Sequence, residues 1–264
     1  MRIHYGKAAV RFYRTDERHR LFAGEVALDV SGDRLRPAWT EGDNTLIVAT
    51  DSMKNFVHAA ALDYPGSDLE GFAAFLGRRF LETYPQVEHA RVDARELPFA
   101  AEGPRSYSPR YGDYGAVALE LDARGVLAHH CARRAMRLVK TTGSSFAGFV
   151  RDRYTTLPET RDRPLFIYLD ARWRHHTFEE RVPTVAVRAV IADIFDAFAS
   201  ESIQHLLHEV GRRVLERFPA VTEVSLEAQN RLWDTAIRSP EGARRTVYTD
   251  PRPPYGVIGL VLAR

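Results

Sequence analysis

The sequence contains few of the features that would place it in a secretory or membrane class. It has one cysteine, Cys131, so an internal disulfide is excluded and a reducing compartment is expected. No apolar run approaches the roughly 18 residues of a membrane-spanning helix, and the first residues lack the apolar stretch of a signal peptide. The chain does not end in a Ser-Lys-Leu peroxisomal signal. We therefore expect a cytoplasmic protein that does not associate with a membrane.

Strong charge and nucleotide-binding motifs are also absent. The net charge is +2 over 264 residues, which gives no electrostatic reason to expect nucleic acid as a partner. The sequence has no phosphate-binding P-loop, no dinucleotide fingerprint and no Gly-x-Ser-x-Gly nucleophile turn. A bound nucleotide or flavin is therefore not expected.

Histidines occur in two adjacent groups, His129-His130-Cys131 and His175-His176. Neighbouring residues of a strand point to opposite faces, so adjacent histidines cannot easily face one ion. Neither a Cys-x-x-Cys nor a His-Glu-x-x-His motif is present. We interpret both groups as strand or surface histidines and expect no metal site.

The first half of the chain alternates between strand and helix patterns. Period-2 alternation predicts strands, and apolar residues spaced at 3.6 predict helices. A capping-box pattern at 67–70 starts the second helix, and Tyr84-Pro85 ends it. The predicted strands are 2–14, 21–30, 87–99 and 114–122, the helices are 53–62 and 69–84, and a loop spans 103–113.

An internal repeat relates the second half to the first. Residues 76–87 recur at 210–221, an offset of 134 (210 − 76), with seven of twelve residues identical. The helical apolar stripe recurs at the same offset, and a second helix pattern covers 190–198. Predicted strands in this half are 126–139, 165–174, 221–226 and 254–262.

The repeat predicts two domains, 1–124 and 125–264. Each would have strand pairs with two helices between them, which is typical of α+β folds with antiparallel sheets and helices on one face. Such sheets leave unpaired edges, and closing several copies into a barrel would cover them. Oligomerisation is therefore expected.

Residues 43–55 form the first stretch suited to binding. Leu46–Ala49 is predicted to be extended and to end at Thr50-Asp51-Ser52, residue types that cap helices. A hydroxyl and a carboxylate beside free backbone N–H groups suit an anionic or polar heterocycle. An ordinary capped helix explains the same pattern.

A long polar segment at 140–163 is the second stretch suited to binding. Loops of this length inside a domain are usually functional. Phe146 and Phe149 are aromatic residues in this segment, and Arg163 precedes a strand, where its guanidinium fork suits a planar anion. The alternative is that the phenylalanines fill the core and the arginine is a surface charge.

Four motifs together resemble the urate oxidase (uricase) family: Tyr5-Gly6-Lys7, residues 43–55, residues 148–163 and Ser202-Ile203-Gln204. The resemblance implies the tunnelling fold, with two ββααββ domains per chain and a barrel-shaped homotetramer that has its sites between subunits. It also implies an oxidoreductase of purine metabolism that converts urate and O2 to 5-hydroxyisourate and H2O2. Enzymes of this factor-independent urate hydroxylase type use neither metal nor organic cofactor.

The resemblance assigns roles to individual residues. It implies a base dyad, an aromatic platform for the purine, a clamp for one edge of the ring, main-chain contacts and an O2 site. A lysine beside a threonine hydroxyl can relay a proton, and a phenylalanine can stack on a purine. The residues are Lys7 and Thr50 for the dyad, Phe146 for the platform, Arg163 and Gln204 for the clamp, Asp51 and Ile203 for the main-chain contacts, and Asn230 for O2. Thr50 and Asp51 would come from a neighbouring subunit.

The chain departs from the family pattern at residues 105–107, at 233–240 and, in the proton relay itself, at Leu232. Where the family has Pro-Asn-Lys-His, this chain has Gln229-Asn230-Arg231-Leu232, so Leu232 replaces the relay histidine. Loss of a general acid–base group commonly costs about 10²–10⁴-fold in rate. Slow urate oxidation, a changed product, action on another purine or pterin-type heterocycle, purine binding without catalysis, and a homologue without ligand are the alternatives.

Overall fold

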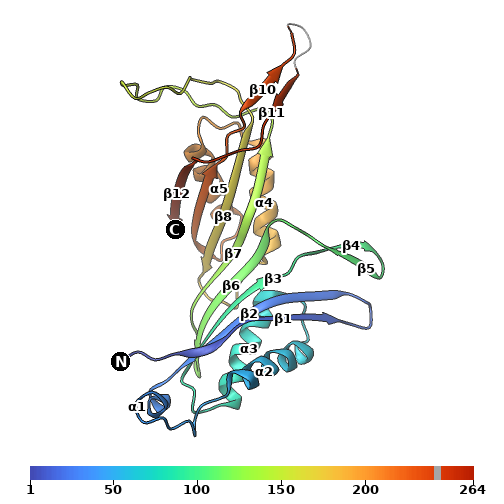
Figure 1. Cartoon of the computed structure of the whole chain (residues 1–264), viewed down its shortest axis with the longest axis vertical. Helices are drawn as coiled ribbons and strands as arrows, with labels where there is room; N and C mark the ends of the chain where they lie inside the picture. The colour runs from blue at the N-terminus through green and yellow to red at the C-terminus, as the bar shows by residue number, and fades with distance from the viewer. Residues whose placement is uncertain (241–244) are drawn as a thin grey trace. The chain divides into compact units, whose positions relative to one another are not determined.

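The computed structural model describes residues 1–240 and 245–264, and it consists of antiparallel sheets with a few helices (Figure 1). By its internal contacts the chain divides into two compact units. The first contains Met1–Ala132 and Thr177–Thr184, and the second contains Arg133–His176 and Val185–Arg264. The expected α+β arrangement of antiparallel sheets and helices is confirmed, whereas the domain boundary at 124 stays a prediction.

The first unit has an antiparallel sheet in the order β1-β2-β3-β6, covered on one face by helices α2 and α3. Alternate strand residues such as Val26, Leu28 and Val30 are almost fully buried beneath the helices, as the period-2 pattern predicts. Short elements η1 (Asp33–Leu35) and α1 (Pro37–Thr40) precede α2. The main elements are β1 (Tyr5–Thr15), β2 (Leu21–Ser31), α2 (Thr50–Asp63), α3 (Leu69–Thr83), β3 (His89–Glu96) and β6 (Tyr114–Asp122).

The second unit has the antiparallel order β8-β9-β12, with α5 against β9 and β12. Strand β7 (Gly125–Lys140) begins in the first unit and ends in the second. The remaining short strands, β10 (Thr235–Arg238) and β11 (Thr246–Tyr248), pair with each other. The main elements are β8 (Leu165–His175), α4 (Thr184–Ala197), α5 (Ile203–Arg217), β9 (Val221–Asn230) and β12 (Gly256–Ala263).

The sequence repeat has a structural counterpart in α3 and α5. Both helices have 15 residues, and the ends of α5 follow those of α3 by 134 residues. A glycine occupies the same repeat position in each helix. A Cβ on Gly77 would lie 2.7 Å from a Leu121 methyl, and one on Gly211 would lie 2.7 Å from a Leu262 methyl. A larger residue at either position would therefore force the facing leucine side chain to move where the helix approaches its sheet.

Several local expectations are wrong. Leu46–Ala49 is not a strand, because Val48 N–H bonds the Tyr5 hydroxyl instead of a neighbouring strand. Helix α2 starts at Thr50 with Ala49 as its N-cap and no side-chain cap. Helix α3 is capped by Asp68, whose carboxylate accepts from Gly71 N–H.

Two further predictions differ from the structure, namely the strand over 87–99 and the loop over 103–113. Strand β3 ends at Glu96, and Pro98 lacks the N–H that a continuing ladder would need. A separate hairpin follows, in which β4 (Phe99–Gly103) pairs with β5 (Ser106–Pro109). The predicted loop therefore contains a strand.

Candidate functional site

Lys7 is positioned by two irregular features of β1. Gly6 faces Asp29 of β2 so closely that a Cβ would lie 2.2 Å from the Leu28 carbonyl oxygen. The pairing register then shifts between Lys7 and Val10, where Ala9 has a φ of 56°. A β-bulge of this kind redirects side chains next to functional sites. Lys7 is half-buried immediately before it.

Thr50 and Asp51 form the first turn of α2. The first backbone hydrogen bond of this region runs from Met53 N–H to Ala49 C=O, so the N–H groups of Thr50 and Asp51 lie ahead of the helical ladder. The Asp51 carboxylate bonds Lys54 and Asn55 of the same helix. Lys54 chiefly, and Lys7 more weakly, lower the pKa of Asp51. The Asp51 side chain is thus engaged within α2, while Thr50 and Asp51 are exposed at the start of the helix.

A hydrogen bond joins β1 to the start of α2. The Tyr5 hydroxyl accepts from Val48 N–H at 2.9 Å, and burial raises the pKa of Tyr5. Tyr5 precedes Lys7 by two residues, and Val48 precedes Thr50 by two. The first unit therefore brings Lys7, Thr50 and Asp51 to one end of β1 and α2.

In the second unit, the segment 140–163 is fastened to the chain that leads into α5. Ser200 N–H donates to Gly143 C=O at 3.1 Å, and Ser145 N–H donates to Ser200 C=O at 2.8 Å. The Ser145 hydroxyl donates to Glu201 at 2.6 Å. We call these contacts of residues 143–145 with 200–201 the loop clamp. It is distinct from the ring clamp predicted for Arg163 and Gln204.

The far end of the same segment returns to the loop clamp. Arg163 N–H donates to Ser144 C=O at 2.9 Å. The Asp162 carboxylate accepts from the Thr142 hydroxyl and from Gly143 N–H, and these bonds lower its pKa. The segment is thus a closed loop, and Phe146 and Thr160 bond each other across it in both directions.

Phe146 and Arg163 lie together in this loop. The Phe146 and Phe149 rings stack with centroids 4.9 Å apart and an angle of 13° between their planes. The Arg163 guanidinium carbon lies 5.9 Å from the Phe146 ring centroid. Arg163 Nε is buried and has no hydrogen-bond partner, and burial lowers the pKa of the guanidinium. Arg163 has no carboxylate partner among the described residues, which distinguishes it from a surface charge.

Ile203 and Gln204 begin α5, directly after the loop clamp. Ser202 is the N-cap, and its hydroxyl accepts from His205 N–H at 3.1 Å. Ile203 is buried, whereas Gln204 is exposed. The loop clamp therefore fastens the loop that carries Phe146 and Arg163 to the start of the helix that carries Gln204.

Asn230 ends β9, where it pairs with Ile167 of β8 and Gly256 of β12. Strand alternation places it on the face of the buried Leu226 and Ala228. Its Oδ1 is buried and has no partner. Asn230 and Arg163 lie at the same end of the β8–β9 pair, since Arg163 precedes the start of β8.

Leu232 lies two residues beyond the end of β9 and is 38% exposed. It contributes no group that titrates. Its exposure shows that this side chain is not part of the core that holds β9 in place.

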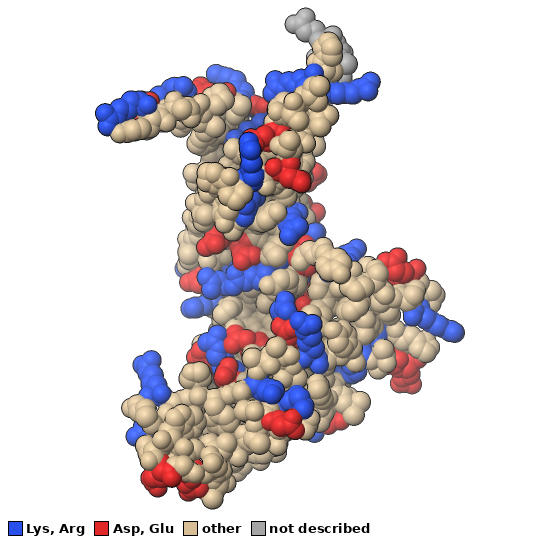
Figure 2. Space-filling view, in the orientation of Figure 1, with Lys and Arg blue, Asp and Glu red and all other residues tan. Residues whose placement is uncertain are grey.

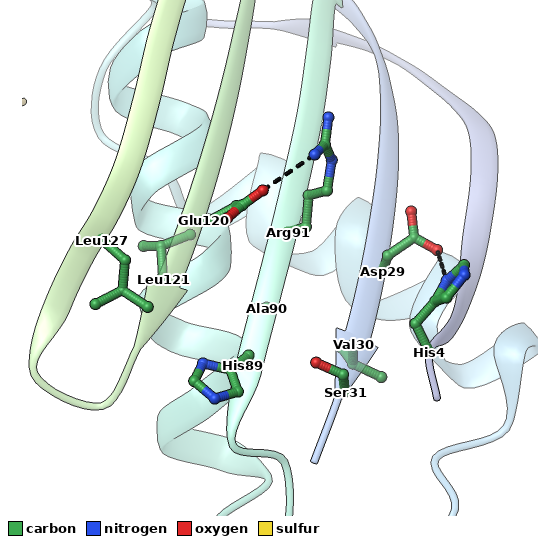
Figure 3. Close-up of a pocket in the computed structure, with 10 residues that line it drawn as sticks. All are labelled: His4, Asp29, Val30, Ser31, His89, Ala90, Arg91, Glu120, Leu121 and Leu127. Carbon is green, nitrogen blue, oxygen red and sulfur yellow. Dashed lines mark hydrogen bonds and ion pairs between the residues drawn. The ribbon is translucent and has the colours of Figure 1, made fainter. Parts of the chain in front are cut away.

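A separate hollow of about 520 Å³ lies on the first unit's sheet, and none of the predicted site residues lines it (Figure 3). Polar side chains that line it contact one another. Arg91 lies 3.1 Å from Glu120, and His4 lies 3.7 Å from Asp29. On the face drawn in Figure 2, basic and acidic side chains are interspersed.

No group of three or more metal-ligating side chains occurs in the part of the chain that the structure describes. Over residues 1–240 and 245–264, no helix has the length and apolar character needed to cross a membrane.

The predicted site residues thus fall into two sets. Lys7, Thr50 and Asp51 lie in the first unit, and Phe146, Arg163, Ile203, Gln204 and Asn230 lie in the second. The sequence interpretation missed the residues that hold the second set in place, namely Lys140, Ser145, Asp162 and Glu201. Their polar side chains flank the long loop, but no local pattern indicates their long-range contacts.

The fold and the two sets of residues define an α+β protein with an aromatic ring beside unpaired polar groups, as a site for a planar polar molecule requires. The family model described as Uricase matches residues 3–101 and 131–259. The chain belongs to the uricase family.

Individual relatives agree with this assignment. The chain is 36% identical to the uricase of Haloferax volcanii, over 96% of each protein. It is 34% identical to the uric acid degradation bifunctional protein of Bacillus sp. (strain TB-90), over 96% of this chain and 59% of that protein. The corresponding values for the bifunctional protein PucL of Bacillus subtilis are 35%, 91% and 53%. This chain therefore spans little more than half the length of the two bifunctional relatives.

A solved structure shows the same fold. The crystal structure of urate oxidase from Bacillus sp. TB-90 has a TM-score of 0.90 with this chain, at 32% identity, covering 99% of this chain and 100% of that one. The uricase from Bacillus fastidious also has a TM-score of 0.90 at 32% identity, covering 99% of this chain and 93% of that chain.

Proposed function

We propose that this chain is a cofactor-independent urate oxidase, which converts urate, O2 and water to 5-hydroxyisourate and H2O2. Membership of the uricase family supports this activity. The observation that carries it within the site is the pair of buried, unpartnered polar atoms, Arg163 Nε and Asn230 Oδ1. An unpaired buried polar group costs about 1–3 kcal/mol. A bound purine supplies an acceptor for Arg163 Nε, and the water or H2O2 of the reaction supplies a donor for Asn230 Oδ1.

Each residue set has its own task in this proposal. Phe146 stacks on the purine, and Arg163 and Gln204 donate hydrogen bonds to one edge of it. Main-chain groups at Ile203 and Asp51 bind the remaining polar atoms. The residues thereby fix the ring for reaction, a contribution that comes from orientation and electrostatic stabilisation.

The chemistry is a two-electron oxidation of the ring. Lys7 and Thr50 accept a proton from bound urate, and the electron-rich anion passes two electrons to O2 held near Asn230. Two protons complete H2O2, and the oxygen of water adds to the ring to form 5-hydroxyisourate. The substrate supplies both electrons, so neither a metal nor an organic cofactor takes part.

We further propose that the two units are tandem tunnelling-fold domains, 1–124 and 125–264, and that four chains assemble into a barrel. Among residues 1–240 and 245–264, β1 pairs only with β2 and β12 only with β9, so each unit has a free sheet edge in this part of the chain. Val257 and Val261 of β12 are 60% and 61% exposed. In the homotetramer, Thr50 and Asp51 of one subunit complete the site built by Phe146 and Arg163 of its neighbour.

A second candidate is a family member that binds urate or another purine or pterin-type ring without oxidising urate. Leu232 supports it, since this side chain cannot replace the proton-relay histidine of the family pattern. It predicts that urate binds and that O2 is not consumed.

The test is a turnover assay with purified chain, in which urate absorbance and H2O2 are followed together. The proposal expects equal amounts of urate lost and peroxide formed, and a loss of turnover in Lys7→Met. The exposed variant Arg172→Met serves as the control. Urate binding without turnover at high enzyme concentration supports the second candidate, and absence of binding refutes both.

A further inference from the structure

Lysine is rare in this chain, and its positions are informative. The sequence has 37 lysines and arginines, of which only Lys7, Lys54 and Lys140 are lysine. Lys7 belongs to the proposed base dyad, and Lys54 bonds Asp51. The third, Lys140, ends β7 and starts the loop that carries Phe146 and Arg163. Arginine occupies the remaining 34 of these positions (37 − 3).

Lys140 is buried and bonded to the main chain. The whole residue is only 8% exposed to solvent. The ammonium donates to Phe198 C=O at 2.6 Å and lies 5.7 Å from the Phe195 ring centroid. Phe198 follows the last residue of α4, and its own N–H closes the final turn on Ile194 C=O. A cation at this position compensates the unpaired carbonyls and the negative end of the helix dipole.

A compact ammonium fits this location better than a guanidinium. It is a point charge on a flexible stem with three donors, whereas arginine carries a wide planar fork. The charged groups that act on Lys140 are Asp196 from α4 and Asp162 from the loop, and both favour the protonated form. Burial opposes them and lowers the pKa of Lys140. The hydrogen bond of the ammonium is thus to Phe198 C=O, while Asp196 and Asp162 act on it only through their charge.

The contact lies at the base of the loop clamp. Phe198 is two residues before Ser200, which exchanges backbone hydrogen bonds with Gly143 and Ser145. Lys140 is three residues before Gly143. The lysine therefore adds a charged bond at the point where the loop first meets the segment between α4 and α5.

We propose that Lys140 is a positioning residue that fastens the loop carrying Phe146 and Arg163 to the end of α4, and so sets this loop relative to Gln204. The ligand in this inference follows from the proposed function, but the fastening does not depend on it. When the fastening is lost, the loop occupies its binding position for a smaller fraction of the time. The apparent dissociation constant rises by the inverse of that fraction.

The experiment compares Lys140→Met with wild type and with Arg172→Met, an exposed control on β8. Amide hydrogen exchange is measured for peptides covering 143–149 and 198–204. Binding of xanthine, a purine without the C8 oxygen of urate, and steady-state urate kinetics are measured in parallel. We expect faster exchange in both peptides, an approximately tenfold higher Kd for xanthine and KM for urate, and a kcat within about twofold of wild type.

Unchanged exchange and unchanged Kd in Lys140→Met would overturn the proposal. A kcat that falls with KM unchanged would also contradict it, because Lys140 would then act in the chemistry. If Lys140→Met does not fold, Lys140→Arg keeps the charge at the end of α4. Its wider head should raise the Kd about two- to fivefold, and wild-type exchange and Kd in this variant would likewise refute the fastening.

The proposed function and the proposal for Lys140 can be refuted separately. If wild-type protein neither binds xanthine nor oxidises urate, the proposed function is wrong. The hydrogen-exchange comparison still decides whether Lys140 fastens the loop.

Discussion

We predict that Arg163 lowers the stability of the folded protein although it contributes to ligand binding. Its Nε is buried without a partner, it has no carboxylate partner in the described part of the chain, and burial lowers its pKa. In Arg163→Met the apolar stem remains and the unpaired donor is removed. Removing the unpaired donor should raise the free energy of unfolding by about 1–3 kcal/mol. Losing the contact with Phe146 should lower it by about 0.5–1 kcal/mol. We expect a net stabilisation of about 1 kcal/mol, or roughly 2–4 °C in Tm.

The same substitution should impair binding. A hydrogen bond to a charged group contributes about 1.5–3 kcal/mol, so the Kd for urate should rise by about 10- to 150-fold. Denaturant unfolding without ligand gives the stability, and equilibrium binding under anaerobic conditions gives the affinity. The control is Arg134→Met, because Arg134 is paired with Asp170 at 2.8 Å and should lose up to about 1 kcal/mol. A destabilised Arg163→Met with wild-type affinity would refute this reasoning.

Three further variants test other parts of the account. Leu232→His should raise the rate of urate oxidation by about 10- to 100-fold in a peroxide assay, and no change would show that a histidine there has no part in the proton relay. Gly6→Ala should lower the free energy of unfolding by more than about 2 kcal/mol, because the new Cβ would lie 2.2 Å from a carbonyl oxygen of β2. Arg212 and Arg213 lower the pKa of Glu209 from 4.5 to about 2, so the stabilisation by this carboxylate is complete above pH 4.5 and is lost as the pH falls towards 2. Glu209→Gln should therefore cost about 1 kcal/mol at pH 7 and much less at pH 2 in denaturant melts, and an equal cost at both would contradict the assignment.

The helices and long strands follow from periodic sequence patterns. The apolar stripe and the repeat of 76–87 at 210–221 place α3 and α5, which have equal lengths at the same offset. Alternation places β1, β2 and β8 to within a few residues. These elements are predictable because burial of one face is encoded by residues close in sequence.

The features that differ depend on contacts between distant residues. Leu46–Ala49 has the composition of a strand, but Tyr5, more than 40 residues earlier, takes the N–H of Val48. Ala9 in the bulge has a positive φ, which its sequence does not indicate because the residue is not glycine. Likewise, the loop clamp joins Gly143 and Ser145 to Ser200 through backbone groups, which carry no residue-specific signal. Motif resemblance predicts the site residues, whereas only the structure reveals what holds the loop of Phe146 and Arg163 in position.

The most direct test of the central proposal is O2 consumption by the purified chain in the presence of urate, measured with an oxygen electrode and a metal chelator present. The account predicts that one O2 is consumed and one H2O2 is formed per urate lost, and that the reaction stops when O2 is removed. Urate that remains intact at high enzyme concentration in air, or a reaction abolished by the chelator, would contradict it.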